Sequence, residues 1–183
     1  VPFIAALTPL APAIRVRIIP ESPATLLAQS ERGEVDIALL TPHDTPPALH
    51  SRALYQEDYV CLMREDHPQA SQPLTLDRFC ALEHVLVSWQ GDSFRGVTDD
   101  ALAALGRTRR VGLSVSSFLV LPEILAVSDM IAVVPRRLAK RASGMKIAPP
   151  PLTIPGFTKS MAWHERNHHD PAQQWLRELL LQS

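Results

Sequence analysis

The sequence of 183 residues contains few cysteines, and this scarcity excludes several classes of protein. Cys61 and Cys80 are the only two, and both stand among apolar residues. A small secreted domain held together by disulfides needs a denser set of cysteines, and a cysteine-based metal site needs closely spaced pairs. We therefore expect Cys61 and Cys80 to be free thiols in the protein interior.

Long apolar runs and an excess of charge are also missing. No run approaches the roughly 20 apolar residues that a membrane-spanning helix needs. The first residues, Val1-Pro2-Phe3-Ile4, lack the basic start and the cleavage site of a secretory signal, so we expect a cytoplasmic protein, although a mature exported chain would have lost its signal. The formal net charge of −1 provides no general attraction to nucleic acid or to an anionic membrane.

Most signatures of catalysis and of cofactor binding are absent as well. There is no phosphate-binding loop and no dinucleotide fingerprint, and Gly91-Asp92-Ser93 lacks the glycine spacing of a nucleophile elbow. The basic cluster of Arg136, Arg137, Lys140 and Arg141 is typical of a solvated helix face. We expect no cofactor and no catalytic set.

One run does match a catalytic pattern. His164-Glu165-Arg166-Asn167-His168 has the spacing of a zincin motif, which binds zinc only where both histidines lie one turn apart on a helix. Here the preceding residues 161–163 are predicted to form a strand, and Asp170-Pro171 is predicted to begin the next helix. We therefore expect no metal at this run, and a zinc hydrolase is a weaker alternative.

The strongest local signal is a short apolar strand between turn-forming residues. Gly33 ends one helix, and Val35-Asp36-Ile37-Ala38-Leu39-Leu40 is then almost continuously apolar, as in a parallel strand covered on both faces. In open α/β sheets, ligands lie beyond the carboxyl ends of such strands. We therefore expect Leu40 and Thr41 to face a small-molecule site.

Strands and helices alternate along the rest of the chain. The predicted strands are 14–19, 35–40, 59–63, 84–87, 110–115, 130–134, 146–148 and 159–163. Predicted helices stand between most of them, and the 17 prolines are scattered at the predicted ends of elements. This alternation favours βαβ units and a mainly parallel sheet, which is an α/β fold.

Two proline-rich stretches interrupt the alternation. Residues 64–73 and 149–156 bracket a central block of strand–helix units. The interruptions predict two lobes, with residues 66–152 inserted into a first lobe that consists of residues 1–65 and 153–183. A cleft between two lobes is a natural binding site for a small molecule.

An ordered set of segments also carries a family resemblance. The segments are GEVDIAL (33–39), YVCLMREDHP (59–68), SSF (116–118), DMIAVVP (129–135), MAWH (161–164) and DPAQQWLR (170–177). Together they resemble the effector-binding domain of LysR-type transcriptional regulators, and the last segment is similar to the branch of nodulation and aromatic-catabolism regulators. Each segment alone is a weak signal, but the ordered set covers nearly the whole chain.

The resemblance implies a fold, a function and partners. The fold is type 2 periplasmic-binding-protein-like, with two Rossmann-like lobes (regulatory subdomains I and II) around a central inducer cleft. The implied function is that of a non-enzymatic sensor, which binds a small carboxylate such as an aromatic acid. DNA would be bound only by an upstream winged helix-turn-helix domain, which is absent from this chain. The chain would form a homodimer or homotetramer without a membrane partner.

The resemblance places the effector contacts at helix starts and strand ends. The positions are Ser22, Leu40, Thr41, Ser88, Trp89, Ser116, Ser117 and Phe118. Serines at a helix start offer hydroxyls, free N–H groups and the positive end of the helix dipole, all suited to a carboxylate. Ordinary helix capping explains the same serines, and Trp89 suits either stacking on a ligand ring or packing.

A solute-binding protein of a transporter is the main alternative. It would have the same fold and the same kind of cleft. It would also need an export signal or a lipid anchor upstream of Val1, which distinguishes it from a regulator.

Overall fold

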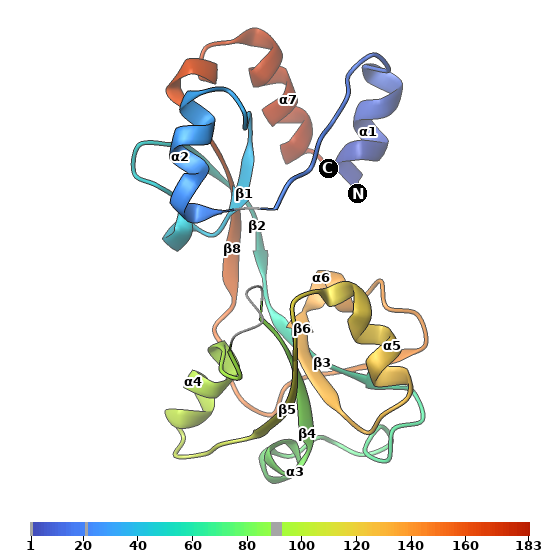
Figure 1. Cartoon of the computed structure of the whole chain (residues 1–183). Helices are drawn as coiled ribbons and strands as arrows, with labels where there is room; N and C mark the ends of the chain where they lie inside the picture. The colour runs from blue at the N-terminus through green and yellow to red at the C-terminus, as the bar shows by residue number, and fades with distance from the viewer. Residues whose placement is uncertain (1, 21, 89–92) are drawn as a thin grey trace. The chain divides into compact units, whose positions relative to one another are not determined.

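A computed structural model describes residues 2–20, 22–88 and 93–183 (Figure 1). The chain divides into two compact units. Unit 1 comprises the residues up to Gln56 and those from Thr158 onward, and unit 2 is Glu57–Phe157. The chain thus enters unit 2 nine residues before the boundary predicted at residue 66, because strand β3 (Tyr59–Arg64) pairs only with strands of unit 2.

The described part of unit 1 contains a small sheet accompanied by helices. The strand order is β1 (Ala38–Leu40), β8 (Phe157–Trp163), β2 (His50–Glu57), and β1 runs antiparallel to β8. The helices are α1 (Pro2–Leu10), α2 (Pro23–Glu31) and α7 (Pro171–Leu181), with short 3-10 helices η1 (Pro42–Asp44) and η3 (Glu165–Asn167). Helices α1 and α7 lie side by side (Figure 1).

Helix α2 begins and ends as its sequence predicts. Pro23 occupies the first helical position after Ser22, where the missing N–H costs no helical hydrogen bond. The helix ends before Gly33, which has a φ of 75°. That left-handed conformation favours glycine, because a Cβ atom would be strained there. The Arg166 side chain closes over this turn, and its Nη1 donates to the Glu31 carbonyl at 3.3 Å.

Strand β1 differs from its prediction in length and in burial. It is three residues long, and its central Leu39 is 46% exposed, whereas Ala38 and Leu40 are buried. The prediction of a strand covered on both faces is therefore wrong. Strand β1 lies at the edge of its sheet, where only alternate side chains reach the core.

The segment 14–19, predicted as a strand, is not one in the structure. Ile14, Val16 and Ile18 are exposed, and with residues of α1 they line an apolar groove. A strand requires a neighbour that takes up its backbone hydrogen bonds, and among the described residues none pairs with this segment. Strand β2 was not predicted, because its residues, HSRALYQE, lack a clear apolar alternation.

The described part of unit 2 contains a larger sheet in the order β5–β4–β6–β3–β7. Besides β3, its strands are β4 (Glu83–Val87), β5 (Arg110–Val115), β6 (Ile131–Pro135) and β7 (Met145–Ala148). Its helices are α3 (Leu76–Ala81), α4 (Val97–Ala103), η2 (Phe118–Val120), α5 (Leu121–Ala126) and α6 (Arg136–Ala139). One core cluster joins strand residues Val60, Leu62 and Val134 to Leu121 and Leu125 of α5.

The sheet of unit 2 is mixed. Strand β4 runs parallel to β5 and β6, whereas β3 runs antiparallel to β6 and β7. The prediction of a mainly parallel sheet is therefore wrong for β3. An apolar run indicates burial but does not encode strand direction, which depends on the neighbouring strands.

Unit 2 also buries a charged hydrogen-bond network. Asp99, on α4, accepts from Nε and Nη2 of Arg109, whose side chain is 1% exposed. Arg109 Nη1 donates to Nδ1 of the fully buried His84 at 3.2 Å, and His84 Nε2 donates to the Phe79 carbonyl at 2.8 Å. Burial, together with the charge of Arg109, lowers the pKa of His84 to about 4, against the opposing effects of the Phe79 hydrogen bond and of Asp99. His84 is therefore neutral at pH 7.

The two cysteines are free thiols, as predicted. Cys61 is fully buried on β3, whereas Cys80 is half-buried at the end of α3. Burial raises the pKa of the Cys61 thiol to about 12. Among the described residues, no helix is long and apolar enough to cross a membrane.

Candidate functional site

The structure brings together two of the predicted contact segments in unit 2. Strands β4 and β5 are parallel neighbours, and Val87 lies opposite Val115 at their carboxyl ends. Ser88, the residue after β4, donates its N–H to the Val115 carbonyl at 2.9 Å. Ser88 and Ser116 therefore leave the sheet at the same edge, where α/β folds bind ligands.

The serines that follow β5 differ in their roles. Ser117 is the N-cap of η2, and its Oγ accepts from the Leu119 N–H at 3.2 Å. This accounts for one lone pair of Ser117, and no donation by its hydroxyl to another described residue is found. Ser116 is exposed, and no hydrogen bond of its hydroxyl to another described residue is found. Phe118 is half-buried and packs against the core cluster of unit 2.

A neighbouring contact was not predicted from the sequence. Ser114, on β5, donates its hydroxyl to the Ser93 carbonyl at 2.8 Å, and Ser93 in turn bonds both backbone groups of Arg95. Ser114 therefore ties the segment before α4 to the edge that bears Ser116. A serine within an apolar strand was the available signal. The predicted contact Trp89 lies outside the described residues.

In unit 1, Ser22 and Leu40 have different surroundings. Ser22 is exposed at the start of α2, and its carbonyl accepts from the N–H groups of Thr25 and Leu26, but its side chain makes no cap. Leu40 is 0% exposed and packs with Leu26, Leu49 and Ala162. The Leu40 side chain is thus part of the core and presents no surface to a ligand.

Thr41 follows β1 and has a polar partner that was not predicted from the sequence. Its hydroxyl donates to the Asp44 carboxylate, and its carbonyl accepts from the Thr45 hydroxyl at 3.0 Å. The hydroxyl hydrogen of Thr41 is therefore occupied within the protein, and only its lone pairs are free. The spacing Thr41-Pro42-His43-Asp44, a hydroxyl followed three residues later by a carboxylate, was the available signal.

The zincin-like run does not have the geometry of a zinc protease. Residues 165–167 form the 3-10 helix η3, and His164 caps it by accepting from the Arg166 N–H at 3.2 Å. The two histidines therefore flank a single turn instead of lying one above the other on an α-helix. No group of three metal-ligating side chains with suitable geometry occurs in residues 2–20, 22–88 and 93–183.

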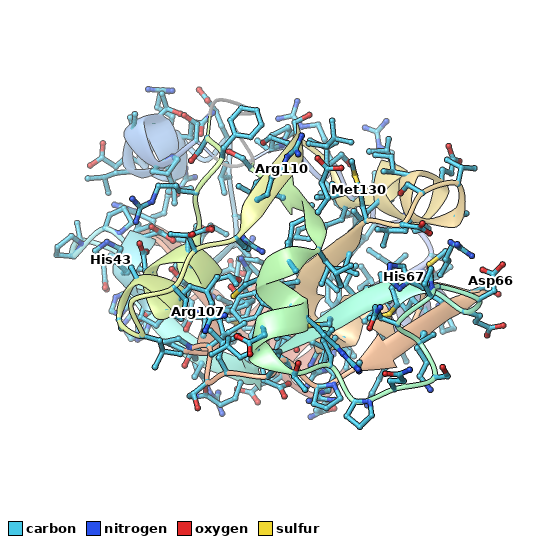
Figure 2. The ribbon with its side chains drawn as sticks, turned by 90° about the horizontal axis from the view of Figure 1, so that it is seen from below. His43, Asp66, His67, Arg107, Arg110 and Met130 are labelled. Atoms are coloured by element: carbon cyan, nitrogen blue, oxygen red, sulfur yellow. The ribbon has the colours of Figure 1, made fainter. Side chains whose placement is uncertain are left out.

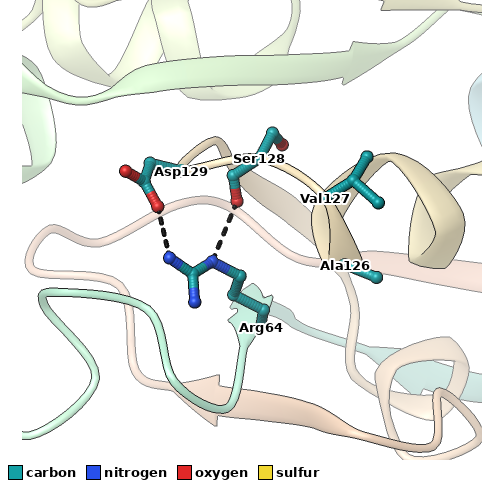
Figure 3. A pocket seen from close by; sticks show the side chains of 5 residues that line it. All are labelled: Arg64, Ala126, Val127, Ser128 and Asp129. Carbon is teal, nitrogen blue, oxygen red and sulfur yellow. Dashed lines mark hydrogen bonds and ion pairs between the residues drawn. The ribbon is translucent and has the colours of Figure 1, made fainter.

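A shallow pocket of about 270 Å³ lies elsewhere in unit 2, between the end of β3 and the end of α5. Figure 3 shows the Arg64 guanidinium bonded to the Ser128 carbonyl and the Asp129 carboxylate. Asp66 forms a second ion pair with Arg64. Two carboxylates neutralise this arginine, so the pocket offers little attraction to an anion. None of the predicted contact residues lines it.

His67, beside this pocket, is buried but fully bonded. Its Nε2 donates to the Asp129 carbonyl at 3.0 Å, and its Nδ1 accepts from the Gln69 N–H at 3.0 Å. Figure 2 shows His67 near the ribbon and Asp66 pointing outward from the same loop. Both ring nitrogens have partners, so His67 orders the loop that follows β3 and needs no ligand to explain it.

The family model described as LysR substrate binding domain matches residues 1–183. The chain belongs to this family. The fold class and the family resemblance predicted from the sequence are thereby confirmed, and the solved structures of related domains agree.

Two curated relatives and one solved structure illustrate the match. The chain is 34% identical to the HTH-type transcriptional activator NagR of Ralstonia sp, over 99% of this chain and 61% of NagR. It is 33% identical to Nodulation protein D 2 of Bradyrhizobium sp. (strain NC92), over 94% of this chain and 52% of that protein. The regulatory domain of MexT from Pseudomonas aeruginosa superimposes with a TM-score of 0.83 at 31% identity, covering 99% of this chain and 88% of that domain.

The family assignment decides between the alternatives raised by the sequence. NagR and MexT are named as transcriptional activators, which does not support a zinc hydrolase or a transporter's solute-binding protein. The chain is thus an effector-binding domain of the LysR type. It spans only about half to three fifths of the length of these two curated relatives.

Proposed function

We propose that this domain senses a small carboxylate, such as an aromatic acid, for a cytoplasmic transcriptional regulator. The observation that carries the proposal is the shared edge of β4 and β5, where Ser88 and Ser116 leave adjacent parallel strands. A carboxylate only accepts hydrogen bonds, so its site must supply donors. The hydroxyls of Ser116 and Ser117 are donors of this kind.

The other predicted contacts take more specific parts in the proposal. Thr41 directs its hydroxyl hydrogen to Asp44, so it offers lone pairs and suits a hydroxyl or N–H group of the ligand. Leu40 acts by packing, because its buried side chain holds the end of β1 in place. Ser22, Trp89 and Phe118 remain proposed contacts on the strength of the family resemblance.

In a regulator that contains this domain, ligand binding would act by thermodynamic linkage, in which ligand affinity and the arrangement of the subunits depend on each other. A ligand shifts an equilibrium between two arrangements only as far as its affinities for them differ. We infer that the carboxylate favours one arrangement of a homodimer or homotetramer, and that DNA is bound by a helix-turn-helix domain outside this chain. The near-neutral charge of these 183 residues is consistent with a domain that binds the ligand and leaves DNA binding to another domain.

Calorimetry with aromatic and aliphatic carboxylates tests the proposed site. Ser88→Ala and Ser116→Ala remove hydroxyls that make no hydrogen bond to another described residue, so the fold should be retained. A hydrogen bond to a charged group contributes about 1.5–3 kcal/mol, so Ser116→Ala should weaken the preferred acid roughly tenfold or more. Ser71→Ala, in an exposed loop, is the matched control and should bind like the wild type.

Two results would count against the proposal. If no carboxylate binds at millimolar concentration, the ligand class is wrong. If an acid binds but Ser88→Ala and Ser116→Ala both keep the wild-type Kd, the ligand class stands and the position of the site is wrong.

A further inference from the structure

A cluster of rings in unit 1 joins the turn after β8 to its neighbours. His168, at the end of η3, stacks on His50 of β2 with 4.1 Å between ring centroids and 18° between ring planes. Trp163, the last residue of β8, lies almost parallel to His168. Arg177, on α7, places its guanidinium carbon 4.5 Å from the centre of the Trp163 ring. Strands β8 and β2 and helix α7 therefore meet at the turn 164–170.

One hydrogen bond in this cluster depends on the protonation state of His168. The indole Nε1–H of Trp163 donates to Nδ1 of His168 at 3.2 Å. An indole nitrogen only donates, so Nδ1 of His168 must carry a lone pair. A protonated imidazole carries hydrogen on both nitrogens, and the bond to Trp163 is then impossible. The observed arrangement is that of neutral His168.

Most of the titratable and charged groups around His168 oppose the placement of a positive charge on its ring. His50 stacks on one face, and His169 lies edge-on with a centroid distance of 4.6 Å. Arg177 donates to the backbone carbonyls of His168 and Asn167 at 2.8 and 2.9 Å, and is itself almost fully buried.

Acidic groups compensate these charges only in part. Glu165 pairs with His50 and lies 4.0 Å from Nε2 of His169, so its charge is already shared. Asp170 and Glu178 act on Arg177 from α7 and its N-cap. Partial burial lowers the pKa of His168, the charges of His50 and His169 lower it further, and Glu165 opposes them.

We propose that His168 is a pH-sensitive latch on the turn 164–170, which connects the last strand of the sheet to helix α7. In the closed latch, neutral His168 accepts from Trp163 and stacks on His50. Protonation removes the bond to Trp163 and adds a positive charge beside His50, His169 and the Arg177 guanidinium, so the turn loosens from β8 and β2. The histidine that completes the zincin-like spacing would thus act as a proton sensor instead of a metal ligand.

The direction of the response follows from the depressed pKa of His168. A loosened turn, exposed to water, restores the histidine to its ordinary pKa of about 6.5 and so takes up a proton more readily than the closed turn. The latch is therefore fully closed above about pH 6.5. It opens as the pH falls from there through the lower pKa of the closed state.

Nuclear magnetic resonance of the ¹⁵N-labelled 183-residue chain, without any ligand, tests the latch. The indole N–H resonance of Trp163, identified with Trp163→Phe, should shift between pH 8 and pH 5 with a midpoint below the ordinary histidine value of about 6.5. The backbone amides of residues 165–169 should shift with the same midpoint. Amides of unit 2 near His84, whose pKa is about 4, should shift little over this range and provide an internal reference.

Two variants assign the titration to a residue. Glutamine offers a carbonyl oxygen to Trp163 but does not titrate, so His168→Gln should abolish the shift while keeping the indole resonance near its high-pH position. His169→Gln, which alters a side chain that is 83% exposed, should retain the shift. A constant indole resonance from pH 8 to pH 5 would overturn the proposal, as would a shift that persists in His168→Gln. Neither result bears on carboxylate binding at Ser116.

Discussion

Arg109 and Asp99 form a two-bond ion pair in the interior of unit 2, with Nε–Oδ1 and Nη2–Oδ2 distances of 2.9 and 2.8 Å. The side chains are 1% and 13% exposed. Burying two charges is costly, so such a pair contributes little net stability over an apolar core. The loss of one partner lowers the free energy of unfolding much more, because it leaves the other charge buried without a partner.

Asp99→Asn should therefore be strongly destabilising. We expect the free energy of unfolding to fall by about 3–5 kcal/mol, as is usual when a buried pair loses one member. Urea unfolding at pH 7 measures it. The control is Asp100→Asn at the next position, whose ion pair with Arg95 is exposed and should contribute less than about 1 kcal/mol. Equal losses in the two variants would contradict the assignment.

The buried His84 makes the stability of the protein dependent on pH. Its pKa is about 4 in the folded protein and about 6.5 in an unfolded chain, so the unfolded state binds the proton first. The stability contribution is therefore complete above about pH 6.5 and is lost as the pH falls toward 4. Between pH 7 and pH 5 we expect a loss of about 2 kcal/mol from this group.

Urea unfolding at several pH values isolates that contribution. His84→Gln removes the titrating group, so the difference between wild type and variant should shrink by about 2 kcal/mol from pH 7 to pH 5. The surface carboxylates titrate equally in both proteins and cancel in this comparison. A difference that stays constant with pH would show that His84 is not protonated on unfolding.

Gly33 is required both for its backbone conformation and for its contact with Arg166. Its φ is 75°, and a Cβ atom there would lie 2.1 Å from Nη1 of Arg166. Gly106 has a similar φ of 65° but open space around it. We expect Gly106→Ala to cost about 1 kcal/mol and Gly33→Ala to cost more.

A double variant separates the two costs at Gly33. In Gly33→Ala combined with Arg166→Ala, the steric part of the cost should disappear, so the sum of the single effects should exceed the double effect. Thermal or urea unfolding provides the values. Strict additivity would mean that the arginine moves aside freely.

These residues also show what the sequence alone predicts well. The left-handed turn at Gly33 and the start of α2 at Pro23 were predictable, because glycine and proline restrict the backbone locally. Strand β2 and the antiparallel direction of β3 were not, because both depend on strands distant in the sequence.

The same distinction applies to the candidate site. Ser88 and Ser116 were predicted as contacts from the family resemblance, and they share an edge because β4 and β5 are parallel neighbours. The complete burial of Leu40 did not, because the position of a strand within its sheet decides which side chains reach the core. The bond from Thr41 to Asp44 joins side chains three residues apart, so its local pattern is visible in the sequence although the bond was not predicted.

The bond from Thr41 to Asp44 leads to a prediction about ligand preference. Because the hydroxyl hydrogen of Thr41 is occupied, the residue should accept a hydrogen bond from the ligand instead of donating to its carboxylate. Thr41→Val keeps the shape but removes the oxygen. It should weaken an aromatic acid that carries a hydroxyl group by roughly three- to tenfold, and leave the unsubstituted acid unchanged. The control is Thr45→Val, because the Thr45 hydroxyl donates to the Thr41 carbonyl and, among the described residues, to no other group. Calorimetry with both acids separates the cases: an equal loss for the two acids would mean that Thr41 binds the carboxylate itself.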